Sequence, residues 1–131
     1  MREALWPDGT GSHAQEVQDF LGGRLKMPLE VLLAVDEEGT PLGFVELSIR
    51  SYAEDCVTDR VAYLEGWYVV PEARRRGVGA ALVRAAEDWG RAQGCSEFAS
   101  DALLGNDVSA AAHHALGFEE PVQIRCFKKN L

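Results

Sequence analysis

The first half of the chain has the pattern of a short helix followed by an antiparallel β-hairpin. Residues 31–35 form an apolar run, residues 36–41 have the composition of a turn, and residues 44–50 alternate between apolar and polar side chains. The apolar side of this second strand consists of Val45, Leu47 and Ile49. Its other side, which we expect to face water or a polar cleft, consists of Glu46, Ser48 and Arg50. Upstream, Ser12 is a suitable N-cap for a helix that begins near His13.

The second half of the chain predicts alternating strands and helices. Residues 61–70 are rich in aromatic and β-branched side chains and stop at Pro71, which predicts a central strand. Apolar residues then recur at helical spacing from Val78 to the C-capping Gly94. A short strand, an Ala-rich helix and a last strand are predicted at residues 97–102, 108–116 and 122–128. This order predicts a mixed α+β fold, in which an antiparallel meander continues into a right-handed parallel crossover.

Composition and charge narrow the class of protein. A chain of 131 residues with 47% hydrophobic residues is sufficient for one globular domain, residues 1–131, and no apolar run reaches the roughly 18 residues that span a bilayer. The formal net charge of −8 repels nucleic acid and anionic membranes and favours cationic partners. The three cysteines are widely spaced and the N-terminus lacks the features of a signal peptide. We therefore expect a cytoplasmic protein with no disulfide framework and no metal.

The most informative stretch is a turn between the central strand and the long helix. Three consecutive cations, Arg74, Arg75 and Arg76, precede Gly77 and Gly79. The free N–H groups at the start of a helix, its positive dipole end and the arginines together favour an anion, and a diphosphate suits them best. A short Gly-x-Gly sequence is also compatible with a solvated helix start, a basic patch for a partner, or a turn that simply needs glycine.

This turn resembles that of the GNAT N-acetyltransferases, whose signature is Gln/Arg-x-x-Gly-x-Gly/Ala. The resemblance extends to Asn106 and to Leu116-Gly117-Phe118. It implies an enzyme that uses acetyl-CoA and a mostly antiparallel mixed sheet, in which one parallel strand pair splays apart around the cosubstrate. The residues that it implies for acetyl-CoA binding are Val69, Val70, Arg74, Arg75, Arg76, Gly77, Val78, Gly79, Ala80 and Asn106.

Several longer segments carry a narrower resemblance. They are Leu5-Trp6-Pro7-Asp8, Ser12-His13, Glu46-Leu47-Ser48-Ile49-Arg50, Leu64-Glu65-Gly66-Trp67-Tyr68-Val69 and Glu97-Phe98-Ala99-Ser100-Asp101-Ala102. These segments resemble the aminoglycoside 6'-N-acetyltransferases, which implies direct acetyl transfer to the 6'-amine of a cationic antibiotic, antibiotic resistance, and a homodimer. The resemblance also implies that the N-terminus is short relative to the family. The expected substrate contacts are Trp6, Asp8, Glu46, Glu65, Trp67 and Asp101.

Three residues are candidates for the catalytic proton transfers. Glu65 carries the one charge in residues 61–70 and is the candidate general base, acting through a water, although a lone strand glutamate more commonly faces solvent or an arginine. Asp101 is the second candidate, as base or as a clamp on substrate ammonium groups. His113 stands where many GNAT enzymes have a tyrosine as general acid. It is a candidate acid, a hydrogen-bonding group or a packing residue, with Tyr68 as a weaker candidate acid.

The resemblance leaves two other functions open. One is a GNAT enzyme that acetylates another amine, such as a polyamine, an amino acid or a protein N-terminus. The other is a catalytically silent module that binds CoA. A panel of amine substrates separates the first of these from an aminoglycoside enzyme, and binding of acetyl-CoA without any turnover would indicate the second.

Overall fold

The structure is a computed structural model that describes residues 1–7 and 12–131, and these residues form a mixed four-stranded sheet in the order β1–β2–β3–β4. Neighbouring strands are antiparallel except for the last pair, which is parallel. The strands are β1 (Glu30–Val35), β2 (Pro41–Arg50), β3 (Val61–Val69) and β4 (Phe98–Ser100). The predicted hairpin, central strand and mixed α+β sheet are confirmed.

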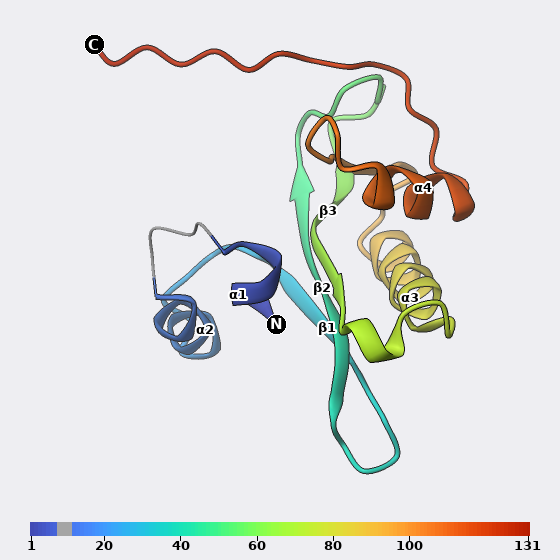
Figure 1. Cartoon of the computed structure of the whole chain (residues 1–131). Helices are drawn as coiled ribbons and strands as arrows, with labels where there is room; N and C mark the ends of the chain where they lie inside the picture. The colour runs from blue at the N-terminus through green and yellow to red at the C-terminus, as the bar shows by residue number, and fades with distance from the viewer. Residues whose placement is uncertain (8–11) are drawn as a thin grey trace.

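Helices lie on both sides of this sheet (Figure 1). The first two helices lie on one side and the two later helices on the other. They are α1 (Arg2–Leu5), α2 (His13–Leu21), the 3-10 helix η1 (Pro71–Ala73), α3 (Val78–Ala92) and α4 (Asp107–Ala115). As predicted, Ser12 caps α2, because its hydroxyl accepts a hydrogen bond from the backbone N–H of Gln15 at 3.3 Å. Within the part of the chain that the structure describes, no helix has the length and apolarity to cross a membrane.

The hydrophobic core lies between the sheet and α3. Its fully buried members come from β2, β3 and the apolar stripe of α3, and they are Val45, Leu47, Leu64, Leu82, Val83 and Ala86. Because side chains alternate along a strand, the residues between them in β2 point to the opposite face, toward α1 and α2. The sheet therefore has an apolar face under α3 and a face under α1 that carries polar and aromatic side chains.

The strand β3 contains one extra residue. Glu46 of β2 pairs with Gly66, and the next residue, Leu47, pairs with Leu64. Glu65 is therefore left over as a β-bulge. The bulge turns the Glu65 side chain to the face of the sheet that α1 covers.

The two parallel strands separate after a short contact. β3 pairs with β4 only from Ala62 to Leu64, whereas β3 continues to Val69. β4 is correspondingly shorter than the strand predicted at residues 97–102. Beyond Leu64, the edge of β3 that faces β4 is open, which is the splayed arrangement that the GNAT resemblance implies.

The strand predicted at residues 122–128 is wrong. The chain after Phe118 has no regular secondary structure and runs away from the rest of the molecule (Figure 1). Its apolar side chains Val122, Ile124 and Phe127 are exposed. Alternation of side chains predicts which of them share a face, but a strand also needs a neighbour for its N–H and C=O groups. Among the described residues this segment has none.

Candidate active site

The turn before α3 offers N–H groups and positive charge to solvent. Gly77 is the N-cap with a left-handed φ of 84°, and Arg75 is also left-handed with φ of 56°. No side chain of the described residues caps α3, and its first turn contains no acidic residue. Arg75 and Arg76 are exposed, while Arg74 donates from Nε to the carbonyl of Val69 at 2.9 Å. The first N–H groups of α3 thus keep their capacity for an anion, and the turn fits a diphosphate.

At the end of β3, Val69 presents its backbone groups to the open edge, whereas Val70, the residue after the strand, does not. The N–H of Val70 donates to the carbonyl of Leu42 at 2.9 Å, so it is committed to the β2 side. Backbone groups alternate in direction along an antiparallel strand, so those of Val69 point toward the open edge. Of the two predicted pantetheine contacts, Val69 faces the gap between β3 and β4, whereas the N–H of Val70 does not.

The remaining residues predicted for acetyl-CoA lie at the starts of two helices. Val78, Gly79 and Ala80 form the first turn of α3 and are half-buried. Asn106 is the N-cap of α4, and its side-chain oxygen accepts a hydrogen bond from the N–H of Ser109 at 3.2 Å. The cap uses one lone pair of this oxygen, so the side-chain NH2 and the second lone pair of Asn106 are left for a ligand.

His113 lies at the point where β3 and β4 separate. Its Nδ1 is 2.8 Å from the carbonyl oxygen of Ser109, and its Nε2 is 3.0 Å from the hydroxyl of Ser100. That hydroxyl lies 3.2 Å from the carbonyl of Leu64, the last residue of β3 that pairs with β4. The Trp67 ring stands edge-on to the imidazole at 5.3 Å between centroids. His113 is therefore fixed on the α3 side of the sheet, beside the splayed strands.

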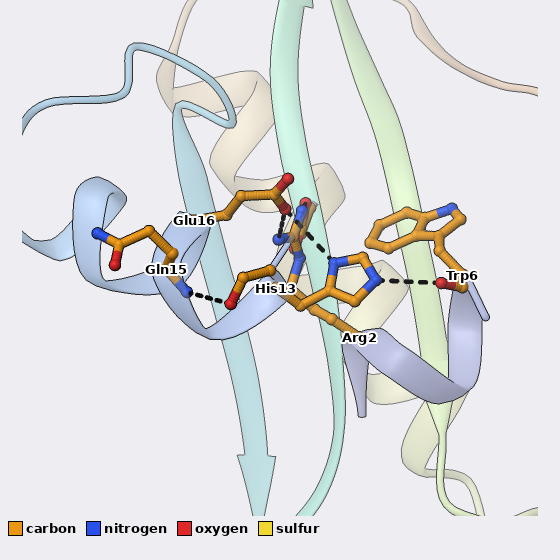
Figure 2. Close-up of polar contacts among 7 residues, drawn as sticks. Arg2, Trp6, His13, Gln15 and Glu16 are labelled. Carbon is orange, nitrogen blue, oxygen red and sulfur yellow. Dashed lines mark hydrogen bonds and ion pairs between the residues drawn. The ribbon is translucent and has the colours of Figure 1, made fainter. Parts of the chain in front are cut away.

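Trp6 lies on the other side of β3 from Trp67. A Cβ at Gly66 would come within 2.5 Å of the Trp6 ring, whereas Trp67 packs against the core under α3. Figure 2 shows His13 between α1 and α2, with Nε2 at 3.0 Å from the carbonyl oxygen of Trp6. Both tryptophans were predicted to pack on the sugar rings, with a place in the core as the alternative for either. The structure puts them on opposite faces of the sheet: Trp6 lies over Gly66 on the α1 side, and the next residue of β3, Trp67, points to the α3 side.

Two further carboxylates were predicted to contact the substrate, Glu46 and Asp8. Glu46 is 5% exposed and forms an ion pair with Arg2, whose Nη2 lies 3.2 Å from Oε2. The same guanidinium bonds to Glu16 at 2.6 Å (Figure 2). Burial lowers the pKa of Arg2, but the bonds to the two carboxylates outweigh burial and raise it. In this structure Glu46 is therefore a buried ion-pair partner of Arg2, and Asp8 lies outside the described residues.

Glu65 is the centre of a polar cluster on the α1 side. Arg50 donates from Nε to Oε1 at 2.9 Å and from Nη2 to Oε2 at 2.6 Å, and the Ser48 hydroxyl donates to Oε1. The guanidinium carbon of Arg50 lies 3.4 Å from the ring centroid of Tyr63. Burial raises the pKa of Glu65, but the bonds from Arg50 and Ser48 outweigh it, so the pKa lies below its ordinary value. The Glu65 carboxylate is ionised near neutral pH.

Asp101 completes this cluster from the neighbouring strand. It follows β4 directly and is exposed. Burial raises the pKa of Tyr63, and the nearby negative charge of Asp101 raises it further. The bond to Glu65 raises the pKa of Arg50, and the charge of Asp101 adds to this effect. The two predicted carboxylates, Glu65 and Asp101, thus both lie near Arg50, and His113 lies on the other face of β3 from Glu65.

Three polar residues of the site were not among the predicted ones. Ser48 and Arg50 belong to the polar side of the strand alternation, so the sequence indicated their direction. Their contact with Glu65 depends on the pairing register of β2 with β3, which no local pattern specifies. Ser100, the partner of His113, had no such signal. Within residues 1–7 and 12–131 no group of three or more His, Cys, Asp or Glu could hold a metal ion.

Known proteins resemble the chain along its length. The model of the acetyltransferase (GNAT) family matches residues 1–118. Aminoglycoside N(6')-acetyltransferase type 1 of Klebsiella aerogenes is 58% identical over 132 residues, which cover 100% of this chain and 87% of that protein. The structure of AAC(6')-Iy in complex with the bisubstrate analogue CoA-S-monomethyl-acetylneamine matches with a TM-score of 0.88 and 34% identity, covering 100% of this chain and 88% of that one. Apo AAC(6')-IG from Acinetobacter haemolyticus matches with a TM-score of 0.85 and 40% identity, covering 99% and 88%.

Proposed function

Because the chain belongs to the acetyltransferase (GNAT) family, we propose that it transfers the acetyl group of acetyl-CoA directly to the 6'-amine of aminoglycosides, as an antibiotic-resistance enzyme. The predicted family, the fold and acyltransferase activity are confirmed by these relatives. The observation that carries the choice of substrate is the 58% identity, across the whole chain, to a protein named for acetylation at this position.

Acetyl-CoA supplies an acetyl thioester, and the chain has a place for each part of it. The first turn of α3, with Arg75, Arg76 and Gly77, suits the diphosphate, since no protein side chain or acid among the described residues competes there. The pantetheine arm would run along the open edge of β3, where the N–H of Val69 points outward and its carbonyl accepts a bond from Arg74. The side-chain amide of Asn106, at the start of α4, is also available to this arm. This path ends near Leu64, where the strands meet.

The amine then approaches from the α1 side of β3. Asp101 would hold ammonium groups of the substrate, and Trp6 would pack against a sugar ring. The Glu65 carboxylate takes the proton of the reacting ammonium through a water, which leaves a neutral nitrogen to attack the thioester carbonyl. Attack forms the C–N bond and a tetrahedral intermediate. As this intermediate collapses and the C–S bond breaks, the nitrogen releases its remaining extra proton to solvent, and the departing thiolate takes a proton or hydrogen bond from His113. The ionised state of Glu65 and the position of His113 across the strand support these roles.

Release of the CoA thiol from acetyl-CoA tests the proposal with a matched pair of antibiotics. Neomycin has an amino group at the 6' position and paromomycin has a hydroxyl there. We expect thiol release with neomycin and none with paromomycin. Equal release with both would move the acetylated position, and turnover with spermidine or a peptide alone would indicate a GNAT enzyme of another specificity. Binding of acetyl-CoA without turnover of any amine would indicate the silent module.

We also propose that the protein is a homodimer. The support is the segment after Phe118, which exposes Val122, Ile124 and Phe127 along an extended chain. Exposed apolar side chains in a row are typical of a surface that another chain covers. The resemblance predicts a homodimer, so the partner that we propose for this surface is a second copy of the chain. The molecular mass in solution tests this proposal.

A further inference from the structure

The hydrogen bonds of Glu65 leave one acceptor position on its carboxylate. Oε1 accepts two bonds, from Nε of Arg50 and from the hydroxyl of Ser48. Oε2 accepts one bond, from Nη2 of Arg50 at 2.6 Å. Each oxygen of an ionised carboxylate has two lone pairs. Oε1 is therefore fully used by the protein, and the second lone pair of Oε2 is the position left for a substrate or a water.

We propose that Arg50 is a positioning residue for acetyl transfer, which fixes the Glu65 carboxylate so that Oε2 faces the reacting amine. The inference rests on the proposed function and adds a residue and an atom to it. A guanidinium that donates two parallel bonds fixes the plane of a carboxylate, which a single charge does not.

Arg50 is itself held in place, which distinguishes it from an ordinary surface cation. Its guanidinium carbon stacks 3.4 Å from the ring centroid of Tyr63, a side chain that is 2% exposed. Ser48, the other donor to Glu65, is 0% exposed. The β-bulge returns the Glu65 side chain over β2, where Ser48 and Arg50 lie at alternate positions. The cluster is therefore built by the sheet, while Glu65 keeps enough exposure to meet a ligand.

The charges around Glu65 give the arrangement a measurable consequence. The groups nearest to it are Arg50, Ser48 and Tyr63. Asp101 lies near Arg50 and Tyr63, and Glu46 on the same side of β2 is paired with Arg2. Loss of the guanidinium removes the cation that keeps the pKa of Glu65 low, whereas burial, which raises the pKa, remains. Because Glu65 must be ionised to take a proton, activity would then be lost at a higher pH.

The test is the pH profile of kcat/KM with neomycin for the wild type and four variants. They are Arg50→Gln, Arg50→Lys, Glu65→Gln and the double variant Arg50→Gln with Glu65→Gln. We expect Arg50→Gln to move the acid limb up by roughly one pH unit or more, and to lower kcat/KM near neutral pH by about tenfold. The kcat/KM and the acid limb of Arg50→Lys should lie between those of the wild type and Arg50→Gln, because an ammonium keeps the positive charge but cannot donate the paired bonds. The KM for acetyl-CoA should not change.

The double variant separates positioning from a general structural role. If Arg50 acts through Glu65, its substitution has little further effect once Glu65→Gln has lowered kcat/KM by about 100-fold. Arg91→Gln, in an exposed ion pair on α3, is the matched control and should keep the wild-type profile. An unmoved acid limb, or losses that add in the double variant, would overturn the inference alone. A folded wild type without turnover of any amine would overturn the proposed function together with it.

Discussion

The Glu97 carboxylate connects the loop after β2 to the start of β4. It accepts hydrogen bonds from the Thr58 hydroxyl and from the backbone N–H groups of Val57 at 3.0 Å and Thr58 at 2.8 Å. These bonds hold the pKa of Glu97 below its ordinary value. The same loop contains the acidic residues Glu54 and Asp55. One side chain therefore fixes an acidic loop near the Glu65 face of the sheet.

Glu97→Gln should lower the melting temperature at neutral pH by a few degrees, because an amide oxygen is a weaker acceptor and has no charge. A carboxylate with a depressed pKa stabilises the fold above its unfolded pKa, and this contribution is lost as the pH falls through the folded value. Thermal unfolding at neutral and at acidic pH should thus show a difference from wild type that shrinks in acid. Glu87→Gln, in an exposed helical ion pair, is the control. A difference that is the same at both pH values would contradict this account.

At the scale of single residues, the sequence specified side-chain type better than side-chain contacts. Glu65 as a charge in an apolar strand, and the polar side of residues 44–50, were found from the pattern. The bonds between them were not, because they depend on strand register and on a bulge. The surroundings of Glu46 and Trp67 were not predictable for the same reason. Their residue types suit a polycationic sugar, but Glu46 is paired with Arg2, and the alternation of β3 turns Trp67 to the α3 side.

Two glycines leave room for the tryptophan rings on the two faces of β3, which are called its two walls below: Trp6 on the α1 side and Trp67 on the α3 side. A Cβ at Gly66 would lie 2.5 Å from the Trp6 ring, and a Cβ at Gly79 would lie 2.9 Å from the Trp67 ring. We expect Gly66→Ala to displace Trp6 and raise the KM for neomycin by about tenfold, with little change for acetyl-CoA. Gly79→Ala should do the reverse, since it alters the turn beside the diphosphate site. Steady-state kinetics with each substrate varied checks both, and equal effects on both KM values would contradict separate walls.

Elements with a strong local period were the most predictable. The hairpin, the central strand and the helices after Ser12 and Gly77 follow from alternation, helical spacing and capping residues. β4 is shorter than residues 97–102, because its ladder with β3 ends where the two strands diverge. Residues 122–128 alternate like a strand and yet form none. What decides the outcome there is the presence of a partner, which a local pattern does not contain.

For the whole molecule, the homodimer proposal predicts a mass. The chain of 14.3 kDa should appear at twice that mass in light scattering. Ile124→Asp places a charge among the exposed apolar side chains, so the variant should be monomeric, because burying an unpaired carboxylate in an interface is costly. Gln123→Asp adds the same charge at the neighbouring polar position and should remain dimeric. A wild type that is monomeric at high concentration would contradict the proposal.

The extra residue at the bulge also changes which positions of β3 share a wall. Before it, the odd-numbered Val61 and Tyr63 lie opposite Arg50 and Ser48, and after it the even-numbered Gly66 and Tyr68 lie opposite Glu46 and Phe44. A substitution in β3 therefore alters one wall at a time. A change in its length would exchange the two walls at once, bringing Trp67 to the amine and Gly66 to the thioester. Divergence of substrate preference along this strand is therefore expected through replacement of residues at constant length.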